Sequence, residues 1–356
     1  MPLDCDYRRA HGHDVCFTAC HAIERGVFGY VRADRAQEVP PPDPRAVDVF
    51  VLAMNHGWPN IGHDAIVMAV RTAACTLADT IAAAGLRVRV VSCDVRRGLA
   101  IPRLPDARGG LYVGTGGPGH IDPSKNDGGD GTQGIVESPA WESPLFALFD
   151  AIHGHPDAAL VGVCHTFGVM SRWLGVADPV LRPAEKGGKS AGIVDSVLTP
   201  ASEAHPWFAG LGPTGSHIRV LDSRLYDLLP RPSIAAHVTP LSYEVDGGAA
   251  GEAITSWEAA RDRSGRMPRV FGVNHHPEIV DRVRALTILW QKRSRGEVSH
   301  DWYRERAEAM NATLRDDATD RCLDVTSRYT LFGPVKYHLE RQIELRSPAA
   351  RGRASS

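Results

Sequence analysis

The order of apolar segments in the first half of the chain constrains its fold more than any other feature. VDVFVLAMN (47–55) is a short valine-rich run, HDAIVMAVRTAACTLADTIAAAG (63–85) has the length of a helix, and LRVRVVSCDV (86–95) is again strand-like. A strand, a helix and a strand in this order predict a parallel pair joined by a right-handed crossover. Two further runs, GGLYVG and ALVGVC, flank the helix-length segment WESPLFALFDAIHGH. We therefore expect a doubly wound α/β domain with a mostly parallel open sheet, whose site lies beyond the carboxyl ends of the strands.

The chain divides into four segments by pattern. Residues 1–45 have no clear period and end in VPPPDPRA, whose prolines resist helix and central strand alike, so we predict an N-terminal arm. Residues 46–280 hold the α/β domain, in which the short segments between 190 and 250 suggest a partly antiparallel excursion before the last core strand, RVFGVNHH. Residues 281–345 are mostly helical in period and form a C-terminal extension, and we expect the tail, 346–356, to be disordered.

Composition excludes several classes of function. The 356 residues carry 40 Lys and Arg against 42 Asp and Glu, a formal charge of -2 without a long basic block, which argues against nucleic acid or an anionic membrane as partners. No apolar run approaches the roughly 20 residues of a membrane helix, and the start MPLDCDYRRAHGHDVC has no apolar core of a signal peptide. The seven scattered cysteines do not resemble a disulfide framework, and we expect reduced thiols. These features predict a soluble, cytoplasmic protein.

Metal and cofactor motifs are weak or missing. The N-terminal arm is rich in potential zinc ligands, but their spacings match no standard paired-ligand pattern. These residues are Cys5, His11, His13, Cys16, Cys20 and His21. Neither a G-x-x-x-x-G-K-[ST] loop nor a G-x-G-x-x-G loop followed by a helix with a suitably placed acidic residue is found in the sequence. We therefore expect no metal and no cofactor.

The stretch LVGVCHTFGVM ends an apolar run on Cys164. Two interpretations compete: a core cysteine that merely packs, or a nucleophile raised on a sharp turn from strand to helix. Such a turn needs small neighbours, and Gly162 is one, while the β-branched Thr166 stands at the second small position. A helix starting at about Thr166 would direct its N-terminal amides at Cys164, which favours the thiolate and provides a donor for an oxyanion.

Two other strand ends carry groups that suit such a nucleophile. GVNHHPE places His276 at the end of the last core strand and Glu278 two residues later. A carboxylate beside an imidazole fixes its tautomer and stabilises the imidazolium, which is what a thiol nucleophile needs. Taken alone, these residues also fit histidines at a strand end beside a solvated glutamate. TGGPG follows the strand LYV and frees backbone amides for an oxyanion, although a turn of this kind is common.

The order of these three motifs resembles that of the class I glutamine amidotransferases. In that family GGP follows one strand, G-x-C ends the next core strand, and HPE follows the last. The stretch PAEKGGKSAGIVDSVLTPASEAHPWFAGL is also similar to the family's segment between the elbow and HPE. The resemblance covers about residues 47–280, and GVNHHPE is its most specific part, with Asn274 and His275 where glutamine and an aromatic residue are usual.

The resemblance implies a flavodoxin-like open sheet and a role for each motif residue. Cys164 would be the nucleophile, His276 the general base and then acid, and Glu278 the group that orients His276. The oxyanion hole would consist of the backbone amides of Gly117 and His165. The implied activity is that of a Cys-His-Glu glutaminase: attack of the thiolate on the carboxamide of a small substrate, L-glutamine in the family, then loss of ammonia and hydrolysis or transfer of the thioester.

The elbow departs from the family's usual C-x-G-x-Q. Thr166 replaces the glycine, and Gly168 replaces the glutamine that helps to bind the substrate glutamine. A triad hydrolase or an acyl or γ-glutamyl transferase acting on a different small amide or ester therefore stays open. So does a non-catalytic regulatory module, although such a module would not need an intact triad. The Cys164-His165 pair also resembles the Cys-His pair at the elbow of the ThiJ/PfpI branch of the same superfamily.

The resemblance also implies partners. A glutaminase that delivers ammonia needs an acceptor, which we expect on a separate synthetase chain. The helices of 281–345 are a possible docking surface for it, but they also suit a homo-oligomer interface or simple packing against the core.

Overall fold

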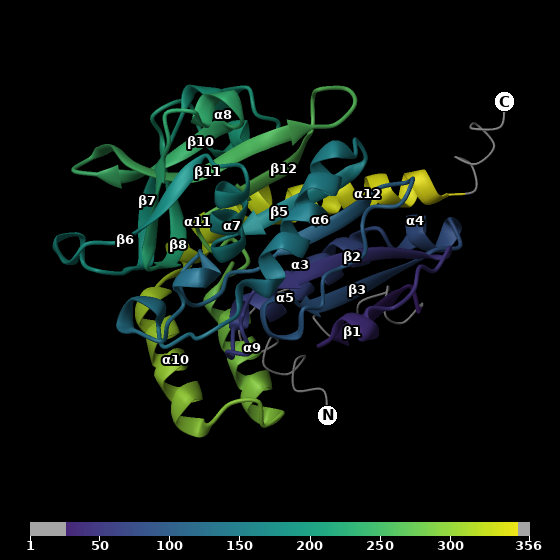
Figure 1. Ribbon diagram of the computed structural model, residues 1–356, viewed down its shortest axis with the longest axis horizontal. Coiled ribbons are helices and arrows are strands. Elements are labelled where there is room, and N and C mark those ends of the chain that lie inside the picture. Colours follow the sequence, from purple (N-terminus) through teal and green to yellow (C-terminus); the bar gives the residue numbers. More distant parts are fainter. Residues whose placement is uncertain (1–25, 348–356) are drawn as a thin grey trace.

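The computed structural model describes residues 26–347, so the Cys- and His-rich part of the predicted arm and residues 348–356 lie outside the described chain. A ten-stranded sheet forms its centre, and a two-stranded sheet lies beside it (Figure 1). In sheet order, the ten strands are β1 (Phe28–Ala33), β3 (Arg87–Asp94), β2 (Ala46–Ala53), β4 (Gly110–Gly114), β5 (Ala158–Val163), β12 (Pro268–Val273), β11 (Ala249–Arg261), β10 (Thr239–Asp246), β7 (Ser190–Leu198) and β8 (His217–Arg224). The separate pair is β6 (Ala177–Leu181) and β9 (Tyr226–Pro230).

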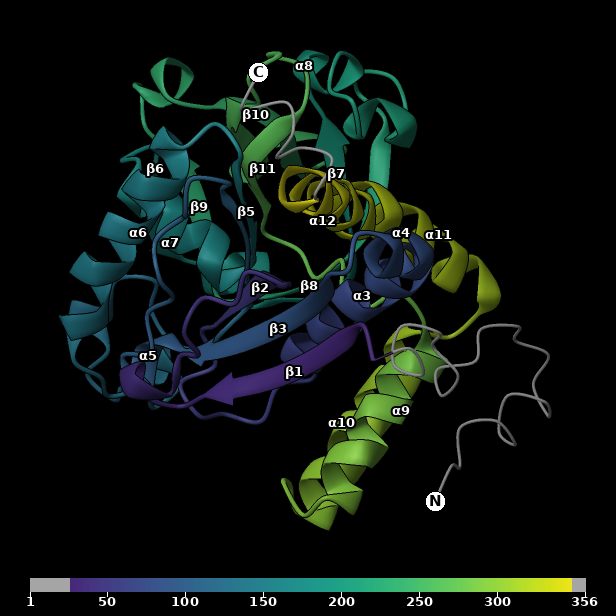
Figure 2. The ribbon, with the colours of Figure 1, turned by 90° about the vertical axis from the view of Figure 1, so that its right-hand side faces the viewer.

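Helices cover both faces of the parallel part of this sheet (Figure 2). The α-helices of the described chain are α3 (Ile61–Thr76), α4 (Ala78–Ala83), α5 (Val95–Gly98), α6 (Glu142–Gly154), α7 (His165–Trp173), α8 (Pro200–Glu203), α9 (Arg282–Ser294), α10 (His300–Thr313), α11 (Asp317–Ser327) and α12 (Gly333–Arg346). On one face lie α3, α4 and α12, and on the other lie α6 and α7. This is the layered arrangement of a doubly wound α/β domain.

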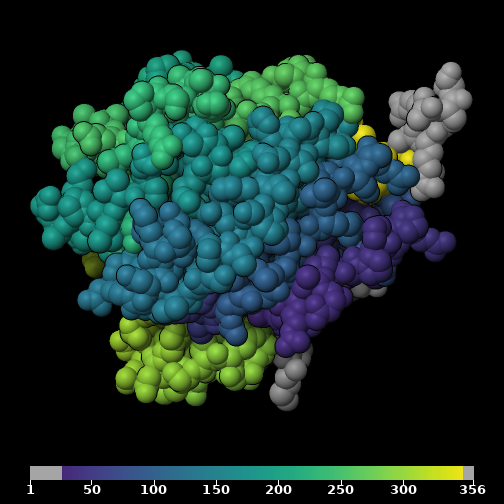
Figure 3. Space-filling view, in the orientation of Figure 1, coloured from purple at the N-terminus to yellow at the C-terminus, as the bar shows by residue number. Residues whose placement is uncertain are grey.

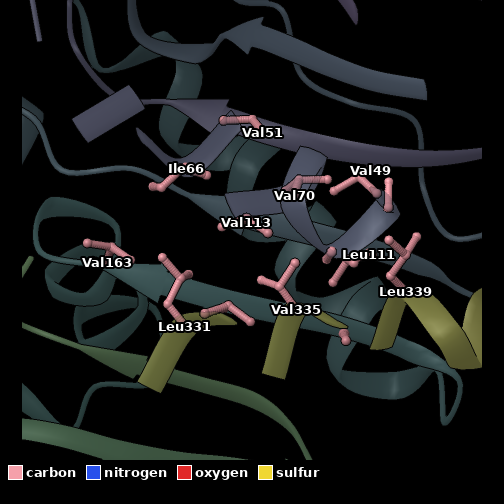
Figure 4. Close-up of a cluster of buried hydrophobic side chains, with 14 of the residues drawn as sticks. Val49, Val51, Ile66, Val70, Leu111, Val113, Val163, Leu331, Val335 and Leu339 are labelled. Carbon is pink, nitrogen blue, oxygen red and sulfur yellow. The ribbon is translucent and has the colours of Figure 1, made fainter. Parts of the chain in front are cut away.

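The alternation of side chains along the central strands explains the two layers. In β2, Val49 and Val51 point into a cluster that α3 and α12 complete, whereas Phe50 and Leu52 point into the cluster formed with α6 and α7. Successive strand residues face opposite sides of a sheet, so a central strand of a parallel sheet is apolar throughout. Figure 4 shows part of the first cluster, to which Val335 of α12 and the valines of β2 and β4 all belong.

The predicted α/β architecture with a helical C-terminal extension is confirmed. The sheet is parallel from β1 to β12 and antiparallel from β11 to β8. The antiparallel excursion predicted between 190 and 250 is therefore mostly a continuation of the main sheet, except that β9 pairs with β6 in the separate two-stranded sheet. The helix predicted over 63–85 is divided at Leu77, whose backbone (φ -107°, ψ 9°) leaves the helical region without a glycine or proline to mark the break.

Two details differ from the sequence prediction. Residues 28–33, within the segment predicted as an arm, form β1 and pair in parallel with β3 at the edge of the sheet. An edge strand needs only one partner, and this partner lies some 60 residues ahead in the sequence, where a local pattern cannot show it.

The prediction of reduced thiols is correct for Cys93, Cys164 and Cys322, but Cys75 is disulfide-bonded. The prediction was wrong for Cys75 because the spacing of cysteines in the sequence does not show which of them meet in space. The boundaries of the four predicted segments stay a prediction.

The C-terminal helices differ in how they pack on the rest of the molecule. α12 returns to the sheet and buries Val335, Leu339 and Ile343 in the main core. By contrast, α9 and α10 form a pair that projects from the body of the molecule (Figures 2 and 3). In α10 no residue is fully buried. Across residues 26–347, no helix combines the length and the apolar character that crossing a bilayer requires.

Candidate active site

Cys164 stands at the junction of β5 and α7, at the carboxyl edge of the parallel strands. Its backbone has φ 50° and ψ -104°, a conformation that residues with a side chain rarely adopt. Two hydrogen bonds hold this turn: the Cys164 N–H donates to the Val273 carbonyl at 2.8 Å, and the Cys164 carbonyl accepts from the Gly168 N–H at 3.0 Å. The strained turn between strand and helix is the geometry of a nucleophile elbow, and it directs the thiol away from the sheet.

Thr166 is accommodated because Gly114 of β4 has no side chain. A Cβ at Gly114 would lie 2.2 Å from Cγ2 of Thr166. The Thr166 hydroxyl donates to the Thr115 carbonyl at 2.8 Å, and this bond ties α7 to the loop after β4. The neighbouring strand thus makes room for the larger Thr166 side chain at the elbow, because it has glycine at position 114.

Replacing Gly114 with alanine should destabilise the protein. The new methyl group overlaps Thr166, and overpacking of this kind lowers the free energy of unfolding by about 1–3 kcal/mol. Urea unfolding measures it, with Gly154→Ala as the control, since a Cβ at Gly154 meets nothing within 4 Å. Adding Thr166→Ala should recover part of the loss. Equal stability of the Gly114→Ala and Gly154→Ala proteins would contradict this account of the packing.

His276 links the thiol to a carboxylate. Its Nδ1 lies 2.9 Å from Oε1 of Glu278, and its ring also hydrogen-bonds to the side chain of Cys164. With Nδ1 turned to the carboxylate, Nε2 is the nitrogen left for the thiol. Burial of the ring lowers the pKa of His276, but the charges and hydrogen bonds of Cys164 and Glu278 outweigh it and raise that pKa well above its usual value. The arrangement therefore favours the protonated imidazolium form of His276 beside the thiol group.

Glu278 is buried against the first turn of α3. A Cβ at Gly62 would lie 2.5 Å from Oε1 of Glu278, so glycine at this position allows the close approach. The N-terminus of a helix favours negative charge, which suits a carboxylate that pairs with an imidazolium. Oε2 of Glu278 has no hydrogen-bond partner within the described chain, and the carboxylate is thus free to serve His276 alone.

The loop after β4 brings backbone amides to the same place. A Cβ at Gly116 would lie 2.9 Å from Cε1 of His276 and 3.5 Å from Cβ of Cys164, so this loop passes directly over the two side chains. Arg96 ties this loop to the end of β2: its guanidinium donates to the Pro118 carbonyl at 2.6 Å and to the Met54 carbonyl at 3.0 Å. The Gly117 N–H makes no hydrogen bond to another residue of the described chain.

His165 supports this loop rather than the chemistry. Its ring is fully buried and interacts with the backbone of Gly117, and burial lowers its pKa well below the usual value. The side chain is therefore a neutral imidazole under Gly117. The main-chain amide of His165 lies at the first position of α7, next to Cys164.

A cavity of about 290 Å³ joins these groups. Cys164, His276, Glu278, Gly117 and His165 all line it, so the structure brings every predicted site residue to one place. Asn274 adds a buried amide whose Nδ2 has no hydrogen-bond partner within residues 26–347. Among those same residues, no group of three or more His, Cys, Asp or Glu side chains is arranged to hold a metal ion.

Several residues of the wall were not predicted from the sequence. Trp302, Arg306 and Met310 of α10 line the cavity and lie one above another, because residues four apart share a helix face. Lys189, before β7, also lines it and forms no ion pair with another described residue. The available signal in the sequence was the spacing of residues 302, 306 and 310 on one helix face, but this spacing does not show which element that face contacts.

Known proteins offer little further information about this chain. No model of a known protein family matches it, and no curated protein matches it. Among solved structures, 53 chains are similar. One of them is the crystal structure of a protein described as a GMP synthase subunit from Thermoplasma acidophilum, with 10% sequence identity and a TM-score of 0.39, over 86% of this chain and 98% of that chain. A likeness of this degree leaves the function to be inferred from the site itself.

Proposed function

We propose that the protein is a thiol amidohydrolase of the class I glutamine amidotransferase type, with Cys164, His276 and Glu278 as its triad. One observation carries the proposal: a cysteine on a strained elbow hydrogen-bonds to a histidine that is itself oriented by a buried carboxylate, on the wall of one cavity. The order β3-β2-β4-β5-β12 also corresponds to the flavodoxin-like strand order 2-1-3-4-5. A purely regulatory module would need none of this geometry.

The groups of the site suit a two-step reaction. The Cys164 thiolate attacks the amide carbon, and the amides of Gly117 and His165 stabilise the oxyanion that forms. The His276 imidazolium gives its proton to the leaving nitrogen, and ammonia departs as the thioester forms. His276, now neutral, then takes a proton from water, which attacks the thioester and releases the acid and the thiolate. Glu278 keeps the Nδ1 proton of His276 in place throughout.

The cavity wall favours a substrate that carries a carboxylate. Lys189, Arg224 and Arg306 contribute positive charge, of which that of Arg224 is already paired with buried carboxylates, while the one acidic residue on the wall, Glu278, pairs with His276. Arg306 pairs with its neighbour Glu305 in an exposed ion pair that contributes little, and its guanidinium lies over the Trp302 ring, 5.5 Å from the ring centroid. L-glutamine, with an α-carboxylate at one end and a carboxamide at the other, fits this distribution of charge.

Replacing Lys189 or Arg306 with alanine should weaken substrate binding without slowing the chemistry. Neither residue contacts the reacting atoms, so we expect KM to rise by about 10-fold for each, with kcat within a factor of two, as the loss of one charge-assisted hydrogen bond implies. Steady-state ammonia release gives both constants. Arg304→Ala, on the exposed face of the same helix, is the control. A fall in kcat with an unchanged KM would contradict the proposed role in binding.

One observation favours a different substrate. A Cβ at Gly168, where the family has its substrate-binding glutamine two residues beyond Thr166, would lie 2.4 Å from Cδ1 of Ile121. Ile121 therefore occupies the space that a side chain at this position would need. The second candidate is a hydrolase, or an acyl or γ-glutamyl transferase, that uses the same triad on another small amide or ester.

Release of ammonia and glutamate from L-glutamine by the full-length protein tests the first candidate. The same assay with a panel of γ-glutamyl amides and esters tests the second. Turnover of glutamine at least as fast as of the other compounds supports a glutaminase, and a clear preference for another compound supports the alternative. A folded protein whose Cys164 reacts with a thiol-directed electrophile could still fail to turn over every compound. That result would argue against catalytic activity of the isolated chain.

The proposal includes a partner. Ammonia is useful only where an acceptor is activated, and we place that acceptor on a separate synthetase chain. The projecting pair α9 and α10 contributes residues to the cavity wall and exposes Trp290, which makes it the candidate docking surface. A homo-oligomer through the same helices is the alternative, and light scattering of the purified protein with and without a candidate synthetase distinguishes them.

A further inference from the structure

A second and larger cavity lies beside the proposed active site. Its volume is about 660 Å³, and it is bounded by β1, β3, α3 and α9. The segment Trp58–Pro59–Asn60 lines both cavities and forms the wall between them. The triad of Cys164 uses none of the other residues of this second cavity, so its polar groups have no assigned role.

Three of these groups form a continuous hydrogen-bonded relay. Oγ of Ser92 lies 2.6 Å from Nε2 of His63, and Nδ1 of His63 lies 2.9 Å from Oδ1 of Asp64. An acidic oxygen at Nδ1 keeps the proton on that nitrogen, so Nε2 is a bare acceptor for the serine hydroxyl. This is the order of contacts by which a histidine base activates a serine, with a carboxylate orienting the base.

The surroundings of the relay also suit catalysis. Ser92 lies near the carboxyl end of the parallel strand β3, on the same face as Val88 and Val90, at the edge of the sheet where ligands bind in α/β folds. Tyr30 of β1 lines the same cavity as Ser92 and interacts with it. Because the serine proton is directed to His63, the Tyr30 hydroxyl is the candidate donor to an oxyanion that forms at the serine.

Asp64 is fixed in its position by α9. Lys292 approaches Oδ2 of Asp64 at 3.0 Å and Arg295 at 3.3 Å, while Oδ1 serves His63. Glu297 in turn pairs with both cations. With Arg32, Arg71 and Asp94 included, the wall carries four basic and three acidic side chains, so its charges nearly balance, and Phe28, Met68 and Ile288 add apolar surface. A cavity of this kind favours an uncharged ligand with an apolar group over a carboxylate-bearing one.

We propose that Ser92, His63 and Asp64 form a second acyl-transfer site, which hydrolyses small neutral carboxylic esters. Oγ of Ser92 attacks the ester carbonyl as its proton passes to Nε2 of His63, and the Tyr30 hydroxyl donates to the oxyanion. The bond from carbon to the alkoxy oxygen breaks, and His63 returns the proton to the departing alcohol. Water then attacks the acyl-serine with His63 as base, which releases the acid and restores Ser92.

The test uses the full-length Cys164→Ala protein, so that its outcome does not depend on the first site. A fluorophosphonate, which reacts with activated serines, should label Ser92, as peptide mass spectrometry would show. Hydrolysis of p-nitrophenyl butyrate should fall by at least about 100-fold on adding Ser92→Ala or His63→Gln, the usual scale for losing a nucleophile or a general base. Ser190→Ala is the matched control, because Ser190 is buried and makes an equally short bond of 2.6 Å to Asp222.

The outcomes separate catalysis from a structural role. Labelling at Ser92 that disappears in the His63→Gln protein, with Ser190→Ala still active, supports the site. Thermal unfolding confirms that each variant is folded, and His63→Gln keeps a polar side chain in case Ser92→Ala is unstable. No label on Ser92 in folded protein, or ester hydrolysis unchanged by Ser92→Ala, would overturn the proposal and leave the relay as a tie between α3 and the sheet.

Discussion

Replacing Cys164 with alanine is expected to reduce ammonia release by about 10⁴-fold or more, the scale at which loss of a covalent nucleophile acts in triad enzymes. No other described thiol can substitute, because Cys93 is buried in the core facing α6 and Cys322 lies on α11. The fold should persist, since alanine keeps the backbone bonds of the elbow and removes one sulfur atom from the wall of a cavity. Ammonia release under saturating substrate, with unfolding curves of both proteins, gives the comparison.

The control for this experiment is Cys322→Ala, which removes a free thiol without touching the site. Its activity should equal that of the unmodified protein. A trapped thioester gives a second readout: mass spectrometry of protein quenched during turnover should find the acyl group on the peptide that contains Cys164. Residual activity of the Cys164→Ala protein within 10-fold of the unmodified protein would mean that the reaction proceeds without this nucleophile.

The motifs were readable in the sequence because each one is local. A strand that stops at Cys164, a proline directly after His276 and a glycine pair at 116–117 are signals of backbone geometry within a few residues. The parallel order of the strands then places all three at one edge of the sheet, because the carboxyl ends of parallel strands lie together. The structure brings these residues together on one cavity, and their catalytic role stays a prediction until it is assayed.

The remainder of the site depends on contacts between distant segments. Arg306 reaches the cavity because α10 packs on α9 and projects along the mouth, which no pattern within α10 reveals. The same holds for Gly114 and Ile121, which make room for Thr166 and close the space at Gly168. The relay from Ser92 to His63 spans β3 and α3, and neither residue stands in a recognisable motif.

Acidification from pH 7 to pH 5 is expected to cost the protein several kcal/mol of stability. Burial lowers the pKa of His205 and His275 to about 3 and that of His338 to about 4, and it holds the pKa of His165 well below its usual value. An unfolded chain protonates these groups below about pH 6.5, whereas the folded protein keeps them neutral. The unfolded state then binds more protons, so the free energy of unfolding falls by about 1 kcal/mol per histidine for each pH unit below 6.5. Total stabilities are about 5–15 kcal/mol, so this loss is large.

His276 changes the free energy of unfolding in the opposite direction and in a different pH range. Its pKa is raised in the folded protein, so it contributes stability that is complete below about pH 6.5 and is lost as the pH rises through the folded value. It therefore does not offset the acid effect, and the stability maximum should lie near neutral pH. Urea unfolding at half-unit steps from pH 5 to pH 8 measures the curve. Replacing His338 with glutamine should reduce the slope of the free energy of unfolding below pH 6.5 by the contribution of about one proton, because glutamine does not titrate. Glutamine can still donate a hydrogen bond to the Pro268 carbonyl, which His338 approaches at 2.8 Å. A stability that is flat between pH 5 and pH 7 would mean that these histidines are hydrated in the folded protein, and that the core around α12 and β12 is more open than its packing indicates.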